Sequence, residues 1–197
     1  MKKILFLLSL IAFSCAASLA DDAVEVNRVK FNSAGQNWIQ MEIELRCLAN
    51  PSPDARNSRF VENIKVKVYL AWERDSQARL FDYYTSEVEI VIMEQNDKNN
   101  VYFYLPGPIV DRDRLRRDPD FYYVEVSVNG EPQLPRGGSA VMSRSISTLE
   151  ILNSFIANAN SGSLDNEHLL MPVYLVSDIN LGRVSNLPVF LRRDVRQ

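Results

Sequence analysis

The stretch Trp38-Ile39-Gln40-Met41-Glu42-Ile43-Glu44-Leu45-Arg46-Cys47 decides the fold class, because apolar and polar side chains alternate along its whole length. A period of two turns one row of side chains toward a core and the other toward water, which is typical of a half-buried β-strand. The inward row includes Cys47, so we expect a buried, unreactive thiol. The segment from Ile64 to Glu73 alternates in the same way and predicts a second half-buried strand.

Shorter runs of the same alternation follow along the chain. They cover Val24–Phe31, Val88–Ile92, Val101–Leu105, Tyr122–Val128 and Val141–Ile146. Turn-forming residues separate these runs, as in Asn50-Pro51-Ser52-Pro53-Asp54 and Asn129-Gly130. Many strands with no helix between them indicate an antiparallel β-sandwich rather than a parallel sheet. We therefore predict a mostly β protein.

The pattern changes period after Ile146. The tetrapeptide Ser147-Thr148-Leu149-Glu150 has the spacing of a capping box with Ser147 as the N-cap. Apolar residues then recur at helical spacing until Asn158–Gly162 ends the predicted helix. A last apolar stretch, His168–Val176, predicts a final strand, and Pro172 within it favours an edge position. The expected domain organisation is a signal peptide at 1–20, a sandwich at 21–147 and a C-terminal helix, edge strand and tail at 148–197.

Two interpretations of this C-terminal appendage stay open. It either caps one end and one edge of its own sandwich, or it docks on a neighbouring subunit by strand exchange or strand addition. Both interpretations bury the same side chains. The candidate partner-docking residues are Leu149, Leu152, Phe155, Ile156, Leu170, Val173 and Leu175.

The N-terminus has the features of a secretory signal peptide. Two lysines precede the apolar run Ile4–Phe13, and small residues follow up to Ala20. The run is too short to span a bilayer comfortably, since roughly 20 apolar residues are needed. We expect cleavage after Ala20 and export to the periplasm, the outer membrane or the cell surface. A competing lipoprotein interpretation anchors the chain at Cys15, although the bulky Phe13 fits that signal poorly.

Composition narrows the chemistry and the partners. The chain of 197 residues has 22 Lys and Arg, 25 Asp and Glu, one His and two Cys. Removal of residues 1–20 takes away two lysines and leaves 20 basic against 25 acidic side chains, a net charge of −5, which disfavours nucleic acid as a partner. Cys47 is then the sole cysteine, so no intrachain disulfide forms and packing must supply the stability.

Few residues suit catalysis or metal binding. His168 is the single histidine, and beside an apolar run it is more typical of a strand end than of a general base. Four aspartates between Asp111 and Asp120 alternate with arginines, which predicts a solvated ion-pair loop rather than a calcium site. We expect no enzyme activity, no metal and no cofactor.

Five tyrosines suggest an alternative function, the binding of glycans. Exposed rings on the predicted strands would stack on sugars and make the protein a soluble ligand-binding module for glycans. The tyrosines concerned are Tyr83, Tyr84, Tyr102, Tyr104 and Tyr123.

Two resemblances add to this interpretation. The segment Leu105–Gly130 resembles the tyrosine-bearing sixth strand of fibronectin type III and related immunoglobulin-like domains, which implies a hydrogen bond from Tyr122 or Tyr123 back to the preceding corner. The second resemblance rests on the signal peptide, the Val24–Asn27 start, the Trp38–Cys47 strand, the Arg/Asp connection and the helix-plus-strand C-terminus. With these features the chain resembles a small family of pilus-associated proteins encoded beside type IV pilus genes in mucin-degrading, Akkermansia-type gut Verrucomicrobia.

That second resemblance implies an exported, non-enzymatic immunoglobulin-like sandwich that acts in pilus assembly or cell-surface adhesion. The implied partners are envelope pilus-assembly proteins or further copies of the chain, bound through the C-terminal appendage, and also host mucin or glycans. No functional residues carry over from the family.

Overall fold

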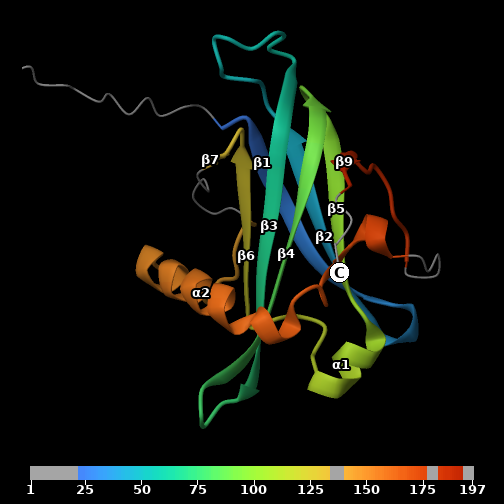
Figure 1. Ribbon diagram of the computed structural model, residues 1–197, viewed down its shortest axis with the longest axis vertical. Helices are drawn as coiled ribbons and strands as arrows, with labels where there is room; N and C mark the ends of the chain where they lie inside the picture. Colours follow the sequence, from blue (N-terminus) through green and yellow to red (C-terminus); the bar gives the residue numbers. More distant parts are fainter. Residues whose placement is uncertain (1–21, 134–139, 177–181, 193–197) are drawn as a thin grey trace, which may run out of the picture.

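The computed structural model describes residues 22–133, 140–176 and 182–192, and shows two antiparallel sheets packed face to face (Figure 1). One sheet has the order β1-β2-β5-β8 and the other the order β7-β6-β3-β4-β9. The strands are β1 Val24–Ala34, β2 Trp38–Cys47, β3 Phe60–Asp75, β4 Leu80–Glu94, β5 Lys98–Leu105, β6 Phe121–Val128, β7 Glu131–Pro132, β8 Met171–Pro172 and β9 Val189–Leu191. The predicted antiparallel β-sandwich with a C-terminal helix is confirmed.

The described chain crosses between the sheets after β2, β4, β5, β7 and β8. The fourth strand, β4, stays beside β3 and does not join the sheet of β1 and β2. In antibody constant domains the fourth strand does join that sheet. The strand order therefore differs from that of antibody constant domains.

The core lies between the inward rows that alternation predicted. In β2 the inward side chains from Ile39 to Cys47 are all buried, and Cys47 is 0% exposed. In β3 the inward row from Ile64 to Trp72 is buried as well. β3 pairs with β4 on one side and β6 on the other, so it is the central strand of its sheet.

The strand predicted at Val141–Ile146 is wrong. This segment makes one isolated bridge, Tyr123 with Met142, and then turns, with the Ile146 amide donating to the Ser143 carbonyl. The hydrogen bond that the fibronectin type III resemblance implies from Tyr122 back to the preceding corner is also wrong. Its hydroxyl donates to the carbonyl of Ala140, 3.3 Å away and later in the chain.

The helix α1, Gly107–Asp113, lies where we predicted a turn and a charged connection. The amides of Ile109 and Val110 both donate to the carbonyl of Pro106, and Val110 is buried. A Cβ on Gly107 would lie 2.1 Å from the carbonyl oxygen of Gln36, so only glycine allows this close approach. Pro108 in the first turn was the sequence signal for this helix.

The helix α2, Leu149–Gly162, confirms the predicted C-terminal helix with changed ends. Thr148, not Ser147, is the N-cap, and its hydroxyl accepts from the Ile151 amide at 3.2 Å. The helix continues through Asn158–Gly162, which we predicted as its end. Ala159 is fully buried there, and burial against the sheet outweighs the weak helix propensity of this stretch.

The final strand predicted at His168–Val176 is much shorter than expected. Only β8, Met171–Pro172, pairs with β5, and a 3-10 turn follows at Val173–Leu175. Pro172 lacks the amide hydrogen that a longer ladder needs, and it lies on an edge strand as predicted. β9 then pairs with β4, so the C-terminal segment contacts an edge of each sheet.

The predicted signal peptide, including Cys15, lies outside the described residues. Within residues 22–133, 140–176 and 182–192, we find no helix with the length and hydrophobicity needed to cross a membrane.

The observed cap is testable with two neighbouring hydroxyls. We predict that Thr148→Ala lowers the free energy of unfolding by about 1 kcal/mol, because one amide in the first turn loses its acceptor. Ser147→Ala is the matched control and should change it by less than about 0.5 kcal/mol. Urea unfolding of both variants measures the difference. A larger loss for Ser147→Ala would restore Ser147 as the cap.

Candidate functional site

One end of the outer face of the five-stranded sheet is aromatic. Ala71 on β3 pairs with Tyr83 on β4 and with Phe121 on β6, which puts two rings on either side of a small side chain. Phe155 of α2 packs on them, with ring centroids 6.4 Å from Tyr83 and 5.9 Å from Phe121. Phe81 lies 5.6 Å from Phe121. These rings seat α2 on the sheet.

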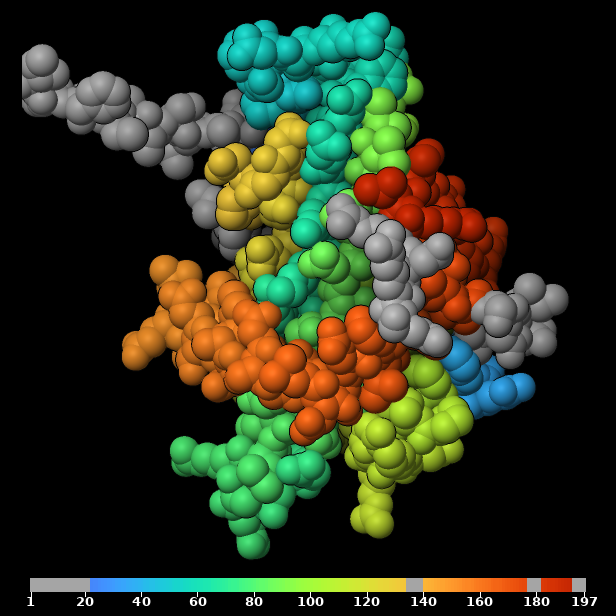
Figure 2. Space-filling view, viewed as in Figure 1, coloured from blue at the N-terminus to red at the C-terminus, as the bar shows by residue number. Residues whose placement is uncertain are grey.

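A groove of about 530 Å³ opens beside this seat, and we call it the aromatic groove. Its lining residues are Phe81, Tyr83, Phe121, Thr148, Glu150, Ile151, Ser154, Phe155 and Asn158. Strand rings and Phe155 form the apolar side, while the first three turns of α2 supply hydroxyl, carboxylate and amide groups. Figure 2 shows α2 in orange at the left of this view, continued toward the centre by the segment that follows it.

Close packing at the far end of α2 holds the helix in place. A Cβ on Gly162 would lie 2.6 Å from a ring carbon of Tyr83. Ser163, which follows the helix, lies within hydrogen-bond distance of the Thr85 hydroxyl at 3.1 Å. The side-chain amide of Asn166 donates to the Tyr83 carbonyl at 3.1 Å. The tilt of α2, and with it the width of the aromatic groove, is therefore set by contacts with β4.

The structure divides the candidate docking residues. Leu152, Phe155 and Leu170 are buried in the core of the same chain, and Ile156 and Val173 are half-buried. Leu149, at 71% exposed, presents most of its surface to solvent, and Leu175 is 39% exposed. Leu149 lies on the opposite flank of α2 from the aromatic groove, because Ile151, Ser154 and Asn158 share the groove flank.

Sequence reasoning missed the residues that form the groove. The candidate residues did not include Phe81, Phe121 or Ile151. Ile151 is 38% exposed and lines the groove. The signal was the spacing of Phe81 and Tyr83, which places both rings on one face of a strand.

The prediction of an exposed tyrosine face is wrong. Tyr84, Tyr102 and Tyr104 are almost completely buried, and Tyr123 is buried as well. Tyr102 and Tyr104 point out of their sheet but lie under Trp38 and the C-terminal segment, where the Ser185 amide donates to the Tyr102 hydroxyl at 3.4 Å. Of the five, Tyr83 alone remains partly exposed, in the aromatic groove.

The Asp/Arg connection contains the predicted ion pairs. Arg112 binds Asp113 through two nitrogens at 2.7 and 2.6 Å, and Arg116 binds Asp120 at 2.6 Å. The Tyr84 hydroxyl donates to Asp113, which ties α1 to β4. The hydrogen bonds from Arg112 hold the pKa of Asp113 below its usual value. Across the described ranges, no group of three or more His, Cys, Asp or Glu side chains is placed to hold a metal ion.

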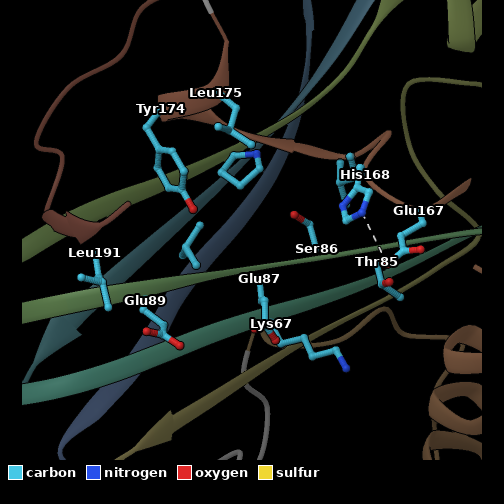
Figure 3. A pocket seen from close by; sticks show the side chains of 13 residues that line it. Lys67, Thr85, Ser86, Glu87, Glu89, Glu167, His168, Tyr174, Leu175 and Leu191 are labelled. Carbon is cyan, nitrogen blue, oxygen red and sulfur yellow. Dashed lines mark ion pairs between the residues drawn. The ribbon is translucent and has the colours of Figure 1, made fainter. Parts of the chain in front are cut away.

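Cys47 and His168 differ in accessibility. Burial, and secondarily the charge of Asp97, raises the pKa of the Cys47 thiol to about 11, so the thiol stays protonated and unreactive at neutral pH. His168 is exposed and lies beside Glu167, with Nε2 and Oε1 3.5 Å apart. Figure 3 shows His168 and Glu167 at the rim of a second cavity, between β4 and the segment of β8.

The Asp113 carboxylate predicts a pH-dependent stability. A carboxyl group with a lowered pKa stabilises the fold above its unfolded pKa, near 4, and this contribution disappears as the pH falls through the folded pKa. We predict that Asp113→Asn costs roughly 1–3 kcal/mol at pH 7, and that its difference from the unaltered chain shrinks near pH 3.

Urea unfolding at both pH values measures this effect. Asp118→Asn is the control, since its pair with Arg117 is exposed and should contribute little. A cost for Asp113→Asn that stayed constant between pH 7 and pH 3 would contradict the assigned ion pair.

Comparison with known proteins shows the fold. No protein-family model matches the chain, and no curated protein matches its sequence. A crystal structure of a protein from Akkermansia muciniphila is similar over 88% of this chain and 95% of its own, with a TM-score of 0.55 and 16% sequence identity. A protein of similar fold and nearly the same extent therefore exists in that organism.

Proposed function

We propose that the protein is a non-enzymatic, exported contact module of a type IV pilus-like system, which binds a protein partner through the aromatic groove in pilus assembly or cell-surface adhesion. The observation that carries the proposal is the groove itself, where Phe81, Phe121 and the aliphatic Ile151 border an open concavity. Its partner contributes one or two apolar side chains to the groove.

The physical basis is the preorganisation of the rings. Phe121 and Tyr83 are held by Phe155 and by their strand pairing, so binding does not have to order them. Aromatic side chains in a concave, preformed site are the usual anchors of protein interfaces. The hydroxyl and carboxylate groups of α2 form a polar rim, which suits an interface that exists in both free and bound states.

The pilus assignment is supported by the whole-chain resemblance described above. The structural neighbour comes from the bacterial group named in that resemblance. Export is supported by the N-terminal Lys2-Lys3 pair, the apolar run and the small residues before Ala20. A fold hosts many functions, so the particular role must be tested on the groove and its partner.

Substitution of two exposed aliphatic residues of α2 distinguishes binding in the groove from binding elsewhere on the helix. We predict that Ile151→Lys abolishes recovery of pilus components in cross-linking and pull-down from envelope fractions, because a charge enters the apolar side of the groove. Leu149→Lys is the matched control on the other flank and should leave recovery unchanged. Recovery of the unaltered protein alone, or equal loss in both variants, would contradict the proposal.

A second candidate function is glycan binding in the same groove. It is favoured by Glu150, Ser154 and Asn158, which place hydrogen-bonding groups opposite the rings. Sugars present apolar C–H faces and hydroxyl groups, and both needs are met there.

The two candidates differ in their dependence on polar groups. If a sugar is the ligand, Asn158→Ala should weaken binding to mucin-type glycans on an array about tenfold, roughly the worth of one hydrogen bond in a buried site. Leu149→Lys should again bind like the unaltered protein. No array signal with the unaltered protein would remove this candidate, while leaving the protein-partner proposal standing.

A further inference from the structure

The aromatic groove offers carboxylates as well as rings. Among its described lining residues, Glu150 alone is ionised at neutral pH, because burial raises the pKa of Tyr83 and its phenol stays neutral. Glu73 stands beside the groove, since it pairs with Phe81 across the two strands and shares the outer face of the sheet with that ring. Both glutamates are exposed, and neither makes an ion pair within the part of the chain that the structure describes.

The arginines of the neighbouring segments do not contact these two carboxylates. Arg74 and Arg116 lie 3.2 Å and 2.6 Å from aspartates, with which they form ion pairs. Arg79, in the turn between β3 and β4, and Arg144, before α2, are exposed and pair with neither glutamate in the described ranges. A cation that enters the groove therefore finds both carboxylates available for direct contact.

The rings of the groove favour the same ligand charge. Phe81, Tyr83, Phe155 and Phe121 form a closed cycle of contacts, with neighbouring centroids 5.6–6.4 Å apart. Phe155 is buried, while the other three rings are half-buried and keep part of their surface open to the groove. The face of an aromatic ring is partially negative and attracts a cation placed within about 6 Å of its centroid.

The chain makes such a contact with its own lysine farther along the same face. The ammonium of Lys67 lies 4.9 Å from the ring centroid of Tyr69. Lys67 also pairs across the strands with Glu87 and Glu125, so this cation has both a ring and carboxylates beside it. In the aromatic groove the rings and the carboxylate are present, and none of the described lining residues supplies a cation.

We infer that the protein partner places an arginine side chain in the aromatic groove, beside the apolar side chains already proposed. This inference rests on the proposed function and names the chemistry of the partner. The guanidinium group stacks on the open rings and donates to the Glu150 carboxylate, while its alkyl stem packs on Ile151. Arginine suits the groove better than lysine, because a guanidinium group is flat, weakly hydrated and able to donate two parallel hydrogen bonds.

The first experiment titrates the full, ¹⁵N-labelled chain with N-acetylarginine amide and follows amide chemical shifts by NMR. We expect a dissociation constant on the order of millimolar, with the largest shifts at Phe81, Phe121 and Ile151. The matched probe, N-acetylcitrulline amide, has nearly the same shape without the charge and should bind about fivefold more weakly. N-acetyllysine amide should also bind more weakly than the arginine probe.

The second experiment removes one charge from the groove. Glu150→Gln should weaken binding of the arginine probe about fivefold and lower the recovery of pilus components from envelope fractions. Glu62→Gln makes the same change at an exposed glutamate near the other end of β3 and should leave both unchanged. Absence of probe binding, shifts confined to other parts of the chain, equal binding of the citrulline or lysine probe, or equal effects of the two variants would overturn the inference.

Ile151→Lys distinguishes failure of this inference from failure of the proposed function. If Ile151→Lys abolishes recovery of pilus components and Glu150→Gln changes neither recovery nor probe binding, the groove binds its partner without an arginine. The inference is then wrong and the proposed function stands. Undiminished recovery with Ile151→Lys would instead overturn the proposed function, and this inference with it.

Discussion

Burial of the aromatic end of the five-stranded sheet is the constraint on which the rest of the structure depends. Ala71, Tyr83 and Phe121 form an apolar patch on the outer face, and each large ring left in water would forgo about 2–3 kcal/mol. α2 covers the patch by inserting Phe155. The cover is incomplete where the helix begins, and this shortfall is the aromatic groove. The C-terminal segment is thus needed to complete the sandwich.

The other end of the same face explains where the cover stops. Beyond Tyr69 the cross-strand rows change to Lys67 with Glu87 and Glu125, which need no apolar partner. Tyr69 marks the boundary: its ring stacks on Tyr123 and lies 4.9 Å from the ammonium of Lys67, while its hydroxyl donates to Glu125 at 2.9 Å. Burial first, and then that hydrogen bond, raise the pKa of Tyr69 well above its usual value. α2 ends beside this boundary, and the cavity of Figure 3 begins there.

The difference between local strand period and long-range contacts also explains which features the sequence could predict. The alternation of Trp38–Cys47 predicted β2 to the residue, because each side chain's environment follows from strand period alone. The burial of Tyr102 and Tyr104 was not predictable in this way, since it depends on residues near Ser185, more than 80 positions later. α1 was missed because its stability comes from the contact of Gly107 with Gln36 and the burial of Val110, and not from an apolar period.

Helical periodicity explains why the structure places the candidate docking residues where it does. Helical spacing correctly grouped Leu152 and Phe155 on one stripe, but periodicity identifies a face that must be buried without saying against what. The chain's own sheet buries it, so a partner can contact only the flanks of α2. Both concavities border β4, and the contacts of Ser163 with Thr85 and of Asn166 with Tyr83 lie between them. Because these contacts fix α2 and the following turn at once, loss of helix docking would alter the aromatic groove and the cavity of Figure 3 together. A substitution at Ile151 would alter the groove alone, and one at Glu87 the cavity alone.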